Sequence, residues 1–133
     1  MAMPEVICLA TAIFFEARDQ PITGQELVAD VVMNRVEHER FPDTVCDVVY
    51  QPKAFSFTHD GKSDNMGDYS TYHDKKAKQV AIQISKDYLL QDQRLGSTAT
   101  HYHTVSIQPF WASAFLVDGV FGDHVFYTCT GYC

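Results

Sequence analysis

The sequence predicts a single α+β domain over residues 1–133, in which helices come first and a small antiparallel β-sheet lies near the C-terminus. Two observations carry this prediction. Apolar residues recur at helical spacing as far as residue 90, and after Gly96 the pattern changes to the alternation of strands. The length of 133 residues, with 46% hydrophobic and 20% charged residues, is typical of one globular domain with one core.

The first helix is expected from Pro4 to Ala17, and its nearly continuous apolar surface indicates a buried central helix. Pro4 suits the first turn, and Glu5 complements the positive end of the helix dipole. Glu16 lies at the other end, where the dipole disfavours a carboxylate. An acid in that place needs an explanation.

The later elements follow from capping residues and periodicity. The second helix is expected from Thr23 to His38, with Thr23 and Glu26 as a capping box. A short third helix should begin around residues 41–44, a long polar loop should cover residues 51–71, and a fourth helix should cover residues 72–90. Residues 98–105 and 121–128 are the expected strands, and residues 110–116 between them are compatible with a short helix.

Charge and hydropathy exclude several classes of function. The net charge of −7 argues against binding to nucleic acid or to an anionic membrane through a basic patch. No apolar run is long enough for a membrane span, so no membrane insertion is expected. The first residues lack a basic segment and carry Glu5, unlike a signal peptide, which predicts synthesis in the cytoplasm.

The four cysteines are too few for a disulfide scaffold. Cys8 and Cys46 lie in apolar runs and are interpreted as small buried hydrophobic residues. Cys129 and Cys133 could close a small loop, bind a metal, or do neither.

Glu16 is the leading catalytic candidate. A carboxyl group whose pKa is raised by burial, yet which can be reached from a cleft, can act as a general acid near neutral pH. The structural alternative is a salt bridge from Glu16 to Arg18 or Arg35.

A second candidate site is formed by histidines. Alternation places His101 and His103 on one face of a strand, and with His124 on the next strand they could bind zinc and leave one position open. The alternative is that they are hydrogen-bonded structural or groove residues. The nearby aromatic residues could stack on sugar rings or fill the core; they are Phe55, Phe57, Tyr102, Trp111 and Tyr127.

Several ordered blocks resemble the SleB/CwlJ-type cell-wall hydrolases, a family that includes spore-cortex-lytic enzymes and phage relatives. The resemblance runs from about residue 9 to residue 127. Its blocks are residues 12–18, which contain Glu16-Ala17-Arg18, and residues 24–36, 41–51, 55–57, 99–103 and 124–127.

This resemblance implies a lysozyme-like fold and cleavage of peptidoglycan glycan strands between N-acetylmuramic acid and N-acetylglucosamine. Glu16 matches the family's catalytic glutamate on a central helix. The activity implied is that of a lytic transglycosylase, which needs one carboxyl group, forms a 1,6-anhydro end and uses no cofactor or metal. No second acid in the matching blocks has an obvious partner position, which agrees with this mechanism. Phe15 and Phe57 depart from residues that are common in the family, which affects subsite detail.

The resemblance and the strand alternation together give a set of expected substrate-binding residues: Ser56, Phe57, Tyr102, His103 and Tyr127. Gln25, Asn34 and Arg35 are expected to brace the second helix against the first. Because the net charge gives no electrostatic attraction to an anionic wall, recognition should rest on sugar contacts. The expected protein is a monomer. A stand-alone lytic domain suits a phage endolysin released by a holin or a spore enzyme held in place by another protein, and the endolysin is preferred.

Two alternatives from other classes stay open. One is a zinc-dependent peptidoglycan amidase or peptidase that uses His101, His103 and His124. The other is a glycan-binding module that keeps the groove but has no catalytic turnover.

Overall fold

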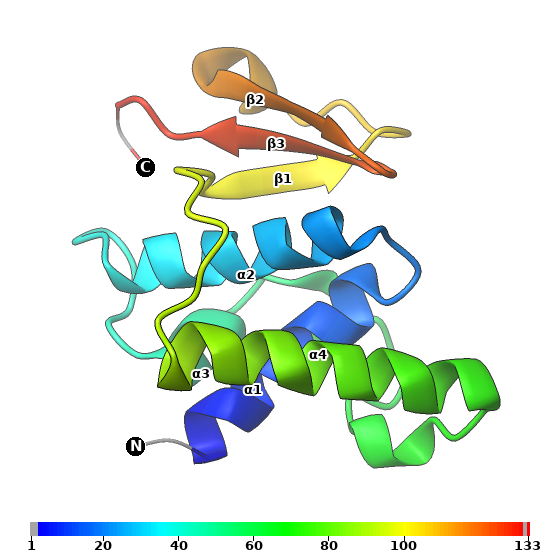
Figure 1. Ribbon diagram of the computed structural model, residues 1–133. Coiled ribbons are helices and arrows are strands. Elements are labelled where there is room, and N and C mark those ends of the chain that lie inside the picture. The colour runs from blue at the N-terminus through cyan, green and yellow to red at the C-terminus, as the bar shows by residue number, and fades with distance from the viewer. Residues whose placement is uncertain (1–2, 132) are drawn as a thin grey trace.

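The computed structural model describes residues 3–131 and 133, and it confirms the α+β class (Figure 1). The helices are α1 (Met3–Ala17), α2 (Ile22–Val36), α3 (Val45–Val49) and α4 (Tyr72–Leu90). The strands are β1 (His101–Thr104), β2 (Leu116–Phe121) and β3 (His124–Thr128), and short 3-10 turns lie at η1 (Ser56–His59), η2 (Met66–Asp68) and η3 (Ala112–Ala114).

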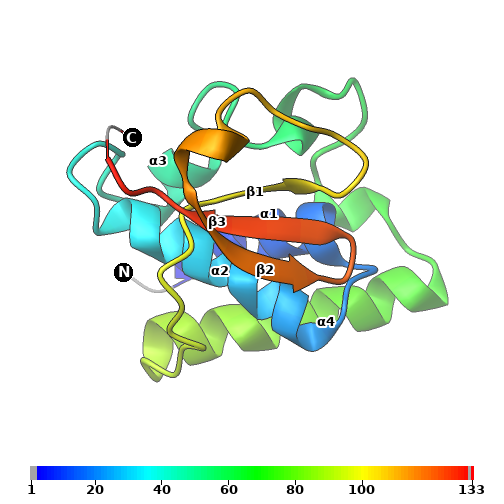
Figure 2. The same ribbon diagram turned by 90° about the horizontal axis from the view of Figure 1, so that it is seen from above.

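The elements form layers. In Figure 1 the sheet lies over α2, and α1 and α4 lie on the other side of α2. The view from above in Figure 2 shows the strands running across α2. Helix α1 contacts α2, α3 and α4, so it is the central helix that its apolar sequence predicts.

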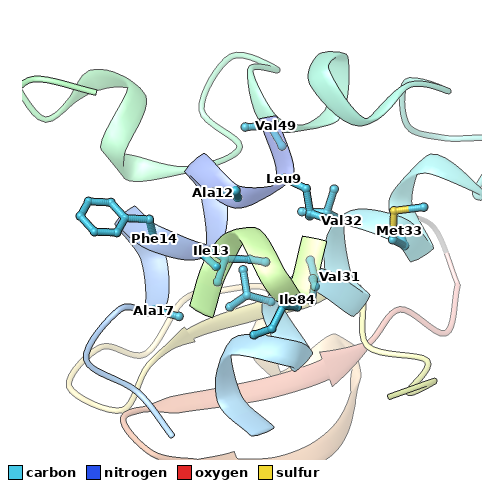
Figure 3. Close-up of a cluster of buried hydrophobic side chains, with 14 of the residues drawn as sticks. Leu9, Ala12, Ile13, Phe14, Ala17, Val31, Val32, Met33, Val49 and Ile84 are labelled. Carbon is cyan, nitrogen blue, oxygen red and sulfur yellow. The ribbon is translucent and has the colours of Figure 1, made fainter. Parts of the chain in front are cut away.

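The core is built around α1. Figure 3 shows Leu9, Ala12 and Ile13 of this helix packed beside Val31 and Val32 of α2. One turn of α1 departs from the prediction of an all-round buried helix, because Ile7 is 45% exposed.

The predicted capping box of α2 is wrong. The helix begins at Ile22 after Pro21, and no side chain caps it. The backbone N–H of Gln25 donates to the Pro21 carbonyl at 3.0 Å, so Thr23 already lies inside the first turn. The same pattern does cap α4, where Thr71 and Asp74 form a capping box.

The sheet has three antiparallel strands in the order β1-β3-β2. In register, His101 pairs with Tyr127 and His103 with Val125. The short helix considered for residues 110–116 is present as η3, but strand β2, which follows it, was not predicted. The expected strand 121–128 is instead the end of β2, a turn and β3. The side chains of β2 are largely exposed on both faces and its register shifts at Gly119, so its sequence lacks alternation.

Both cysteine pairs form disulfides, which corrects the interpretation of Cys8 and Cys46 as buried thiols. The bond between them joins α1 to α3, with Cα atoms 5.2 Å apart. The bond between Cys129 and Cys133 closes a small loop, which was one of the three possibilities considered for these two residues. Glu5 strengthens the α1–α3 junction, because its carboxylate accepts a hydrogen bond from the Val45 backbone N–H at 3.1 Å.

Removal of the Cys8–Cys46 bond is expected to lower the free energy of unfolding by about 2–4 kcal/mol, since the bond closes a long loop in the unfolded chain. The double variant Cys8→Ser/Cys46→Ser can be compared with wild type by urea denaturation. Cys129→Ser/Cys133→Ser is the control, and it should cost less because the two residues are only 4 apart. Equal losses in the two double variants would contradict this account.

No helix within residues 3–131 combines the length and the apolar character that a membrane crossing requires.

Candidate active site

A cavity of about 550 Å³ opens where the end of α1, the start of η1 and strand β1 meet. This volume lies in the range of small-molecule sites. Among the described residues that line the cavity, Glu16 is the only carboxylic acid. The other lining residues are Phe15, Arg35, Lys53, Ala54, Ser56, His59, Tyr102, His103, Thr104, Ile107, Pro109, Trp111 and His124.

Glu16 is held by groups from two distant parts of the chain. The Tyr102 hydroxyl of β1 donates a hydrogen bond to Glu16 Oε1. Hydrogen bonds from the Ser56 side chain and the Phe57 backbone reach the same carboxyl group. Burial raises the pKa of Glu16; these three bonds oppose the rise, and the negative charge of Asp60 adds to it. The costly acid at the helix end is therefore a buried group whose pKa is shifted in the direction that a general acid requires.

The salt-bridge alternative for Glu16 is wrong. Arg18 lies 3.9 Å from the Asp74 carboxylate instead. Arg35 Nε donates to the Thr100 carbonyl at 2.8 Å.

Aromatic packing fixes the η1 turn beside Glu16. Phe55 and Phe57 are buried on either side of Ser56, which leaves the serine exposed to the cavity. The Phe57 ring stacks on Phe15 of α1 with ring centroids 5.1 Å apart. This contact ties the hydrogen-bonding turn to the helix that carries the acid.

Strand β1 is placed by α2. Asn34 Nδ2 donates to the carbonyls of Ser97 and Ala99 at 2.9 and 2.7 Å, and Arg35 donates to the next residue, Thr100. Gln25, Asn34 and Arg35 were all expected to brace α2 against α1. Asn34 and Arg35 instead hold the segment that leads into β1. Of the three, only Gln25 bonds toward α1, by donating to the Gln20 carbonyl just after that helix.

The five expected substrate-binding residues divide into two groups. Ser56, Tyr102 and His103 line the cavity. Phe57 and Tyr127 do not line it and are only 4% and 5% exposed. They lie behind the wall, where Phe57 supports Phe15 and the Tyr127 hydroxyl is 2.8 Å from His103 Nε2.

The histidines do not form the three-ligand zinc site. His101 and His103 share one face of β1, but His124 pairs with Thr104 in register and its ring contacts Tyr102 on the other face. Among the described residues, no group of three His, Cys, Asp or Glu side chains could hold a metal ion. Burial lowers the pKa of His101 to about 4, so this imidazole is neutral near pH 7.

Sequence reasoning missed several residues of the cavity wall. Lys53 and His59 come from the polar loop, and Ile107 and Pro109 come from the segment after β1. No motif marks them. Arg35 also lines the cavity, although it was expected only to brace α2 against α1.

A second, open cavity of about 790 Å³ adjoins the first. The two share Lys53 and His59, so these side chains stand on the rim between them. Its other lining residues are Tyr50, Pro52, Thr58 and Asp64.

The sequence model of the Cell Wall Hydrolase family matches residues 19–127, which is most of the chain. The chain belongs to this family. Two solved structures are similar to nearly the whole of this chain. The catalytic domain of the Bacillus cereus SleB protein superposes with a TM-score of 0.66 and 28% identity, covering 93% of this chain and 89% of that one. The catalytic domain of the germination-specific lytic transglycosylase SleB from Bacillus anthracis superposes with a TM-score of 0.69 and 26% identity. This match covers 96% of this chain and 97% of that one.

Spore cortex-lytic enzymes are similar to this cell wall hydrolase over a shorter segment. The enzyme of Oceanobacillus iheyensis is 41% identical over 58 residues, and that of Bacillus subtilis is 38% identical over 58 residues. The segment covers 44% of this chain but only 21% and 19% of those proteins. The family match begins just after Glu16, so the assignment of this residue rests on its geometry.

Proposed function

We propose that this cell wall hydrolase cleaves peptidoglycan glycan strands between N-acetylmuramic acid and N-acetylglucosamine, with Glu16 as the catalytic acid. The observation that carries the proposal is a carboxyl group with a raised pKa, fixed by Tyr102, Ser56 and Phe57 at the wall of a ligand-sized cavity. The similarity to a domain described as a lytic transglycosylase supports the same reaction.

The count of carboxyl groups favours a lytic transglycosylase over a hydrolase. Hydrolytic glycosidases normally use two carboxyl groups that face the scissile bond. Glu16 is the only acid in the lining, and nearby Asp60 is exposed and bonds to the backbone N–H of Lys62 at 2.9 Å. One residue must therefore serve both steps.

The two steps return Glu16 to its starting state. First, Glu16 gives its proton to the glycosidic oxygen as the bond from that oxygen to C1 of the muramic acid breaks. Next, the C6 hydroxyl of the same sugar bonds to C1 and gives its proton to the ionised Glu16. The products are a free hydroxyl on one sugar and a 1,6-anhydro end on the other, and no water is consumed.

Tyr102 and Ser56 orient the carboxyl group for both transfers, and His103 borders the sugar on the sheet side. Phe57 acts indirectly, by packing against Phe15 of the cavity wall. Tyr127 acts in the same way, through its hydrogen bond with His103. The single catalytic domain, the monomeric state and holin-dependent release stay predictions.

Mass spectrometry of fragments released from purified peptidoglycan tests the proposal. Anhydro-muramic ends are expected. Reducing muramic ends would identify a hydrolase and require a second carboxyl group. Cleavage of peptide or amide bonds would overturn the glycosidase assignment, and tight binding with no released fragments would favour the non-catalytic module.

Tyr102→Phe should shift the pH profile in a defined direction. Glu16 must be protonated in the free enzyme, so kcat/KM should fall as pH rises through its raised pKa. The Tyr102 hydroxyl lowers that pKa, and its loss should move the alkaline limb to higher pH. The maximum kcat/KM should also fall about tenfold, since a hydrogen bond to a charged group is lost.

The matched control for this profile is Tyr72→Phe on α4, whose side chain is 76% exposed. This substitution should leave unchanged both the pH of the alkaline limb and the maximum kcat/KM. An alkaline limb that stays in place in Tyr102→Phe would show that Glu16 is not the titrating acid.

A further inference from the structure

The cavity contains a buried positive charge that the mechanism above does not use. Arg35 is only 8% exposed, and its guanidinium carbon lies 5.0 and 5.6 Å from the ring centroids of Phe41 and Phe55. The one hydrogen bond of its side chain within the described residues runs from Nε to the Thr100 carbonyl. No carboxylate of the described residues forms an ion pair with it, although buried guanidinium groups are normally paired.

The unpaired end of Arg35 faces the cavity. Arg35 is part of the cavity lining. Neither terminal nitrogen of Arg35 is among the fully buried side-chain nitrogens that lack a hydrogen-bond partner. Because these terminal nitrogens make no hydrogen bond to a described residue and are not fully buried, we infer that they face the cavity that Arg35 lines. Burial lowers the pKa of Arg35, which reflects the cost of holding this charge away from water.

The rest of the cavity adds to the positive potential. Lys53 stands on its rim, and the one acid in the lining, Glu16, is uncharged in the form that starts the reaction. The site is therefore locally cationic in a chain whose net charge is −7. The net charge alone predicts no such local excess of positive charge.

We propose that Arg35, with Lys53 at the rim, binds a carboxylate of the substrate. The inference rests on the proposed function, because it takes a peptidoglycan strand as the ligand. A guanidinium presents parallel N–H donors that match the two oxygens of a carboxylate. Peptidoglycan offers this group from two sources: the lactyl carboxylate of a muramic acid without peptide, and the free carboxylates of the stem peptide.

Binding to three tetrasaccharides separates these possibilities. One alternates N-acetylglucosamine with peptide-free muramic acid, the second carries stem peptides on the muramic acid, and the third is the neutral N-acetylglucosamine tetramer. Calorimetry on the Glu16→Gln protein, with recovery of intact ligand, should show at least about tenfold tighter binding of an anionic ligand than of the neutral one. The tighter of the two anionic ligands identifies the source.

Substitutions then assign the preference to residues. Arg35→Gln should remove most of the preference, and Arg35→Lys should retain only part of it because a lysine lacks the planar fork. Lys53→Gln should reduce it by about threefold and weaken its salt dependence. Lys75→Gln, an exposed position on α4, is the matched control and should change nothing.

The proposal is overturned by equal affinity for the neutral and anionic ligands, or by a preference that persists in both Arg35→Gln and Lys53→Gln. Because Arg35 also bonds to Thr100, circular dichroism and melting temperature check the fold of its variants. If Arg35→Gln does not fold, the proposal is tested by the preference of the Glu16→Gln protein for anionic over neutral ligand and by the effect of Lys53→Gln on that preference. Ligand cut by Glu16→Gln would refute the catalytic assignment of Glu16, while the binding preference would still be measured.

Discussion

Glu16→Gln is expected to reduce the release of glycan fragments by about 10²–10⁴-fold while the protein stays folded. Glutamine has nearly the same shape and can still accept the Tyr102 hydrogen bond, but it cannot give a proton to the glycosidic oxygen. The loss should lie toward the upper end of this range, because the same carboxyl group serves both proton transfers. Fragment release from purified peptidoglycan is the measurement.

The same substitution should leave the stability unchanged or raise it at neutral pH. A carboxyl group whose pKa is raised in the folded state binds its proton more tightly there than in the unfolded chain. Its contribution to stability therefore falls as pH rises from the unfolded pKa, near 4.5, through the folded pKa. Glutamine has no charge and avoids that loss.

Glu26→Gln is the matched control for the Glu16 experiment. Glu26 lies half-buried on α2, outside the cavity, and burial also raises its pKa. It should keep full activity. Full activity in Glu16→Gln, or a similar loss in both variants, would contradict the assignment of Glu16.

Asp30→Ala is expected to lower the free energy of unfolding by roughly 2–4 kcal/mol, because two backbone N–H groups lose their acceptor. Asp30 is buried on α2 and accepts hydrogen bonds from the Tyr88 hydroxyl at 2.7 Å, the Ser97 N–H at 2.7 Å and the Gly96 N–H at 3.4 Å. The Tyr88 hydroxyl keeps the Glu26 carbonyl as an acceptor at 2.9 Å, so the cost comes mainly from the Gly96 and Ser97 N–H groups, at about 1–3 kcal/mol for each donor left without a partner.

The effect of Asp30→Ala should extend to activity. The bonds to Gly96 and Ser97 fix the segment that leads into β1, and β1 carries Tyr102. Urea unfolding measures the stability. A fall in kcat/KM at temperatures where the variant is still folded would indicate that Tyr102 has been displaced. Asp43→Ala, at an exposed position, should change neither quantity. A loss below about 1 kcal/mol would show that the network is replaced by water.

The helices were predicted well because their buried faces impose a period on the sequence. The fourth helix, residues 72–90, was predicted with its observed ends. Strand β2 was missed because an edge strand with two exposed faces has no apolar period. The pairing of Cys8 with Cys46 was also missed, since it depends on how α3 docks against α1.

The candidate site was predictable where a residue conflicts with its surroundings. Glu16 stood out as an acid at the unfavourable end of a buried helix. Tyr102 was expected to contact sugar, and its bond to Glu16 could not be foreseen because it depends on the docking of the sheet. No sequence pattern indicated that the charge of Arg35 lacks an ion-pair partner. This fact depends on the positions of all the carboxylates of the described residues in the folded chain.

The bond between Tyr102 and Glu16 joins residues 86 positions apart. The acid is synthesised early and the group that orients it much later, so a nascent chain emerging from the ribosome has no assembled centre until its last quarter has folded onto α2. A protease cut in the exposed segment just after β1 would break the covalent link from that strand to β2 and β3, and would leave its hydrogen bonds to β3 as its main connection to the sheet. Such a cut should lower the activity more than it lowers the helical content.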